Sequence, residues 1–183
     1  SLAFNNFTSD GVKLGGQQTV TKSLSGMITK IASSKNLIVT GNCTIENGYF
    51  NSDLTFKDYT AEAAFRIKGI GFLRNNVVFN GDTEFEEGLD IGCSKLTLNG
   101  DCTAYDDIRY SSGTITGEGW LKTHGGLYIT AASPVISKLS FAGSLPQSFT
   151  SSSALNVSQL ENLNTSTKGV YFDGTINVTG AIY

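Results

Sequence analysis

A short alternating pattern recurs along this chain of 183 residues. It consists of an apolar residue, any residue, a second apolar residue, any residue, and then glycine or a polar turn residue. Alternation of this kind is typical of a β-strand that buries one side. The clearest copies are residues 37–41, 77–81, 96–100, 113–117, 139–143 and 170–174.

The second apolar residue of each copy serves as an anchor for measuring the repeat. Nine anchors recur with a mean spacing of about 19 residues: Val20, Val39, Phe56, Phe79, Leu98, Ile115, Phe141, Val157 and Phe172. Propeller repeats are longer, at about 40 residues, and a β-sandwich places its strands about 8–12 residues apart. We therefore expect an all-β chain that forms a single right-handed parallel β-helix (β-solenoid) of about nine coils.

The composition agrees with stacked coils and excludes several other classes of protein. Glycine, serine, threonine and asparagine make up 75 of the 183 residues, and 39 % of the chain is hydrophobic, which is too apolar for a disordered tail. The net charge of −3 provides no basic footprint for nucleic acid. There is no apolar run of about 18 residues, so we expect no membrane insertion.

The three cysteines test the register of the repeat. Cys43 and Cys102 each lie four residues after an anchor, and even offsets face inward with the anchor. We expect both thiols to be buried and, at three coils apart, about 14 Å from each other, too far for a disulfide. The spacing of these two and Cys93 matches no zinc motif.

Two regions of the chain are less regular. Residues 1–35 are expected to form an N-terminal coil or capping segment before a solenoid over residues 36–183. Within the first region, residues 18–31 fit either a strand or an amphipathic capping helix. Residues 174–183 look like a strand with no polar cap, so we expect either a further domain of a longer chain or partner chains that cover the edge.

Several segments resemble known β-helix families. Residues 36–45 (NLIVTGNCTI) and 95–102 (KLTLNGDC) resemble the coils of parallel β-helix proteins, particularly bacteriophage tailspikes and tail fibres. That resemblance implies a homotrimer in the virion tail that recognises bacterial surface polysaccharide and aids host attachment. Residues 114–122 are similar to the coils of autotransporter passengers, which implies an adhesin at the bacterial surface or secreted. Unpaired cysteines favour assembly in a reducing compartment, as in phage.

Side chains at odd offsets from an anchor are expected to face outward. Offsets three, five and seven of three successive coils predict an outward patch with many carboxylates and the single tryptophan. Asp82, Asp101 and Glu118 should stack in one column with like charges about 5 Å apart. The predicted patch consists of Asp82, Glu84, Glu86, Asp101, Tyr105, Glu118, Trp120 and Lys122.

Three interpretations of the patch remain open. It could be a solvated polar face, or a carbohydrate-binding face on which aromatic rings stack against sugars and carboxylates accept hydrogen bonds from hydroxyl groups. It could also be the site of a polysaccharide depolymerase, because a glycoside hydrolase needs two carboxyl groups. We expect no cofactor and no metal. Asp106, Asp107 and Arg109 are expected to form a local surface ion pair, and His124 an exposed corner.

Overall fold

The computed structural model describes residues 13–14, 37–42, 48–50, 54–61, 64–67 and 69–183. Every regular element in these ranges is a β-strand, and none of the described segments is a helix long and apolar enough to cross a membrane. Segment 18–31 and Cys43 lie outside the described residues. In chain order the strands are β1 (Lys13–Leu14), β2 (Leu37–Asn42), β3 (Gly48–Phe50), β4 (Leu54–Ala61), β5 (Phe65–Ile67), β6 (Gly71–Phe79), β7 (Thr83–Phe85), β8 (Leu89–Leu98), β9 (Cys102–Ala104), β10 (Ile108–Thr116), β11 (Leu121–Thr123), β12 (Leu127–Ile129), β13 (Val135–Phe141), β14 (Gln147–Ser151), β15 (Leu155–Asn162), β16 (Val170–Asp173) and β17 (Ile176–Val178).

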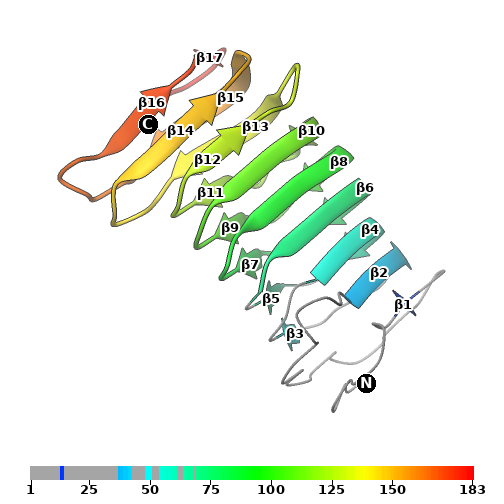
Figure 1. Ribbon diagram of the computed structural model, residues 1–183. Helices are drawn as coiled ribbons and strands as arrows, with labels where there is room; N and C mark the ends of the chain where they lie inside the picture. The colour runs from blue at the N-terminus through cyan, green and yellow to red at the C-terminus, as the bar shows by residue number, and fades with distance from the viewer. Residues whose placement is uncertain (1–12, 15–36, 43–47, 51–53, 62–63, 68) are drawn as a thin grey trace.

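The strands stack in parallel into a β-solenoid, as the repeat predicts. Each strand pairs in parallel with the equivalent strand of the next coil (Figure 1). One row of positions shows the winding, because each member pairs in register with the next: Leu54, Gly71, Leu89, Ile108, Leu127, Phe149 and Phe172. This row covers about six turns, fewer than the nine coils expected for the whole chain, and β1 to β3 add further pairings before Leu54.

Each coil has three faces. Face A contains the first halves of β4, β6, β8 and β10, followed by β12, β14 and β16. Face B contains the second halves of those long strands, followed by the starts of β13 and β15 and by β17. Face C contains β5, β7, β9, β11 and the ends of β13 and β15. The long strands turn between faces A and B where register shifts occur and φ is positive, as at Asn75 (φ 58°) and Gly113 (φ 92°).

The interior is filled by apolar side chains from all three faces. A phenylalanine cluster occupies the coils of β4 to β7, with ring centroids 5.3 to 6.3 Å apart: Phe56, Phe65, Phe79 and Phe85. All four side chains are buried. This core explains the alternation of strands such as β5, β7, β9, β11 and β12, in which the first and third residues are buried.

The predicted anchors do not form one ladder, and Val20 lies outside the described residues. Those from Phe56 to Val157 are buried, while Phe172 is 46 % exposed although its ring packs on Phe149. Ile115 was expected to align with Leu98, yet it pairs with Leu96. The reason is that each face carries its own inward-outward-inward pattern, so spacing alone does not tell which face a copy belongs to.

Two cysteines of the described region are free and buried. Cys102 is fully buried in β9, which confirms the prediction from the repeat, and Cys93 is 1 % exposed in β8. Burial raises the pKa of the Cys93 thiol to about 11 and that of Cys102 to about 12. Both thiols are therefore protonated, poorly nucleophilic members of the core.

Thr83 leaves a polar atom in this core. It stacks beneath Cys102 in register, is fully buried, and its hydroxyl makes no hydrogen bond of normal geometry. The adjacent thiol is only a weak partner. We expect Thr83→Val to raise the free energy of unfolding by about 1 kcal/mol, because it replaces an unsatisfied hydroxyl with a methyl group of similar size. Urea denaturation measures the change, and a lower midpoint would contradict it.

Candidate functional site

The outward surface of face C brings most of the predicted patch together. Its central row runs through paired positions on successive strands. In order the row contains Arg66, Glu84, Thr103, Lys122, Ser140 and Glu161. The predicted residues Glu84 and Lys122 thus lie two coils apart on one face, with Thr103 between them.

The predicted column of Asp82, Asp101 and Glu118 is wrong in its last member. Cys102 pairs with Leu121, so Trp120, not Glu118, follows Asp101 in the stack. The backbone N–H of Trp120 donates to Oδ1 of Asp101 at 2.9 Å, and the N–H of Asp101 donates to Oδ1 of Asp82 at 2.9 Å. These two aspartates therefore tie one coil to the next at the corner between faces B and C.

Glu118 lies apart from the carboxylates with which it was grouped. It is at the corner between β10 and β11, and its side chain is 89 % exposed. Lys138 of β13 donates to its backbone carbonyl at 2.8 Å and approaches its carboxylate at 3.2 Å. The structure leaves no stack of three carboxylates here.

Cations accompany the carboxylates of face C. Arg66 contacts Glu84 at 3.4 Å and Glu86 at 2.8 Å, while Lys122 contacts Asp101 at 2.6 Å. Partial burial opposes ionisation of Asp101, but the hydrogen bonds from Lys122 and the Trp120 N–H, with the lysine charge, outweigh it and lower its pKa. The surface is thus a set of ion pairs, not a cluster of bare negative charge.

Tyr105 presents the exposed aromatic ring of this surface. The side chain is 41 % exposed, its ring centroid lies 4.8 Å from that of His124, and the Arg66 guanidinium lies 5.7 Å from the ring centroid. Partial burial, then the charge of Glu84, raises the pKa of the Tyr105 phenol. Burial and nearby Lys122 lower the pKa of His124, so the imidazole is neutral at pH 7.

Arg66 and His124 were missed as members of this surface by sequence reasoning. The signal was present in the spacing, since His124 follows Tyr105, and Glu84 follows Arg66, by about one length of the repeat. Trp120, in contrast, is only partly exposed, and its ring packs edge-on against Tyr183 with centroids 6.3 Å apart. Tyr105 is therefore the more accessible aromatic ring on face C.

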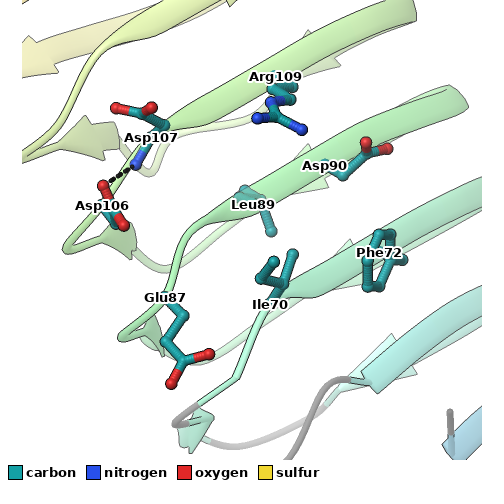
Figure 2. Close-up of a pocket in the computed structure, with 8 residues that line it drawn as sticks. All are labelled: Ile70, Phe72, Glu87, Leu89, Asp90, Asp106, Asp107 and Arg109. Carbon is teal, nitrogen blue, oxygen red and sulfur yellow. Dashed lines mark hydrogen bonds between the residues drawn. The ribbon is translucent and has the colours of Figure 1, made fainter. Parts of the chain in front are cut away.

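A separate pocket of about 250 Å³ lies on the outside of face A (Figure 2). Its lining residues come from β6, β8, β10 and the turns that lead into them: Ile70, Phe72, Glu87, Leu89, Asp90, Asp106, Asp107 and Arg109. The predicted ion pair of Arg109 with its neighbours is wrong, because within the part of the chain that the structure describes Arg109 makes no ion pair. Instead Oδ1 of Asp106 accepts from the Asp107 N–H at 2.9 Å, and Oδ1 of Asp107 accepts from the Gly126 N–H at 2.7 Å.

Neither surface provides a metal site. Among the described residues there is no group of three or more histidine, cysteine, aspartate or glutamate side chains that could hold a metal ion. Comparison of the chain with protein-family models, with curated proteins and with solved structures finds no match.

Proposed function

We propose that this chain is a carbohydrate-recognition module that binds a bacterial surface polysaccharide through face C. The observation that carries the proposal is the half-exposed Tyr105 ring, which lies beside both Arg66 and His124 on face C. Aromatic faces stack on the C–H faces of sugars, and charged groups around them bind hydroxyls through strong hydrogen bonds.

The surface around Tyr105 offers both donors and acceptors to a polymer. Arg66 and Lys122 donate, while Glu84, Glu86 and Asp101 accept. These side chains project from strands about 4.8 Å apart whose backbones are fixed by the ladder. A rigid surface of this kind loses little conformational entropy when a long saccharide binds, and this small loss favours affinity.

The electrostatics of face C support binding over hydrolysis. A glycoside hydrolase needs one carboxylic acid with a raised pKa to protonate the leaving group. The pKa of Asp101 is lowered instead, and Arg66 holds both Glu84 and Glu86 in ion pairs. The depolymerase interpretation therefore finds less support in these carboxylates than the binding interpretation does.

We also propose the setting of this recognition: a homotrimeric tailspike or tail fibre in a virion tail, acting in host attachment. The parallel solenoid fits that class of protein, and the two buried, unpaired thiols fit assembly in a reducing compartment. An autotransporter-type adhesin at the bacterial surface is the alternative setting. It would use the same surface for the same kind of ligand.

We expect Tyr105→Ala to weaken polysaccharide binding about 2- to 10-fold, because it removes the exposed stacking ring. Biolayer interferometry against a panel of lipopolysaccharides and capsular polysaccharides measures the effect. Tyr171→Ala is the control, since Tyr171 is 69 % exposed in β16 on face A, away from this surface.

Two results would contradict the proposal: equal binding by both variants, or no binding of the unchanged chain to any member of the panel. An assay for new reducing ends on the same samples separates a binder from a depolymerase. We expect none to form. Activity that Asp101→Asn abolishes would favour the depolymerase instead.

A further inference from the structure

The pocket on face A has the chemistry of a saccharide subsite that is separate from face C. We propose that it binds one pyranose unit that carries no carboxylate or phosphate, most tightly an amino sugar. The inference rests on the proposed function, in that it takes the ligand to be a saccharide. It concerns different residues, so the two proposals can fail independently.

One side of the pocket is apolar and held in place. Ile70 and Phe72 line it, and Figure 2 shows both at the β6 side of the cavity. The guanidinium of Arg74 lies 5.6 Å from the centroid of the Phe72 ring. Arg74 is itself fixed by the carbonyl of Leu73 at 2.8 Å and the carboxylate of Asp90 at 2.8 Å. The wall can therefore support the C–H face of a sugar ring.

The opposite side of the pocket carries unused polar groups. Asp106 and Asp107 each use one carboxylate oxygen in the turn, which leaves the second oxygen of each to accept from a ligand. Glu87 and Arg109 form no ion pair within the described part of the chain. Carboxylates that accept from neighbouring hydroxyls, with one guanidinium that donates, suit the hydroxyl groups of a pyranose.

The charge and the size of the pocket further restrict the class of saccharide that it can bind. Arg74 neutralises Asp90, so Glu87, Asp106 and Asp107 face a single cation, Arg109. This excess of negative charge disfavours an acidic sugar and favours a protonated amine. A volume of about 250 Å³ is below the range of roughly 300–1,000 Å³ typical of pockets for larger ligands, which suits one sugar unit and not a longer saccharide.

Ligand-observed NMR titration with three methyl glycosides tests the inference. We expect methyl glucosaminide to bind more tightly than methyl glucoside by about threefold or more, and methyl glucuronide to bind weakest. Asp106→Asn keeps the Oδ1 acceptor of the turn but removes the charge, and should reduce glucosaminide binding several-fold. Asp173→Asn is the matched control, because Asp173 lies on the same face three coils beyond Arg109.

Several outcomes would overturn the inference. These are tightest binding of the glucuronide, no binding of any of the three glycosides, or an equal loss of binding in Asp106→Asn and Asp173→Asn, which would indicate a general charge effect. Tyr105→Ala distinguishes the two proposals, since it should leave glycoside binding unchanged. Polysaccharide binding that depends on Tyr105 while the pocket takes no glycoside would leave the proposed function standing without this subsite.

Discussion

Replacing Phe79 with alanine is expected to lower the free energy of unfolding by about 3–5 kcal/mol. The side chain is fully buried, and its ring meets those of Phe56 and Phe65 edge-on, with centroids 5.8 and 5.3 Å away. Alanine would remove a large apolar group and leave a cavity that rigid stacked strands cannot close.

Urea denaturation followed by far-UV circular dichroism and by the fluorescence of the single tryptophan, Trp120, measures this loss. Tyr171→Ala, which truncates an exposed aromatic ring in β16, should change stability by less than about 0.5 kcal/mol. A loss below about 1 kcal/mol for Phe79→Ala would show that the phenylalanine cluster does not hold these coils together. An unchanged fluorescence midpoint beside a shifted dichroism midpoint would show that the coils unfold independently.

Gly117→Ala should be the next most damaging change, with a loss of about 2–4 kcal/mol. Gly117 has φ +112°, which a side chain strongly disfavours, and a Cβ atom there would lie 2.0 Å from the carbonyl oxygen of Leu98 in the preceding coil. Strain and overlap with backbone therefore act together. Gly117 is the first residue of the corner between β10 and β11, and this corner leads to Trp120 and Lys122 of the candidate site.

Gly169→Ala separates the two effects. Gly169 also has a positive φ, +63°, but a Cβ atom there would meet nothing within 4 Å. We expect it to cost about 1 kcal/mol, the strain alone. Thermal denaturation of both variants provides the comparison. Similar losses at the two positions would show that the close approach to Leu98 does not matter.

The fold class could be predicted from the chain because alternation is local. A strand that buries every second residue reveals its inward side in its own sequence, as the copies around Phe79 and Leu98 do. The burial of Cys102 was predicted in the same way, from its even offset of four residues after the anchor Leu98. No comparison between coils is needed for such predictions, and burial confirms them for the anchors from Phe56 to Val157, while Phe172 is 46 % exposed.

The composition of the candidate site was harder to predict, because it depends on how neighbouring coils align. Ile115 was predicted to align with Leu98, whereas it pairs with Leu96, two residues earlier. The same shift of two residues placed Glu118 above Asp101, at the position that Trp120 occupies in the structure. The same alignment determines that Arg66 meets Glu84 and that His124 meets Tyr105. Loops of different length leave the coil at its corners, so the mean length of the repeat does not identify individual partners.

Alternation along the chain was enough to predict a stack of strands and the inward side of most of them, since it is a property of each strand alone. The choice of neighbours between successive coils came from the three-dimensional arrangement, because each of the three faces repeats the same pattern. The pocket on face A shows this most clearly. Phe72, Glu87 and Arg109 lie far apart in the sequence and meet only because three coils stack in register.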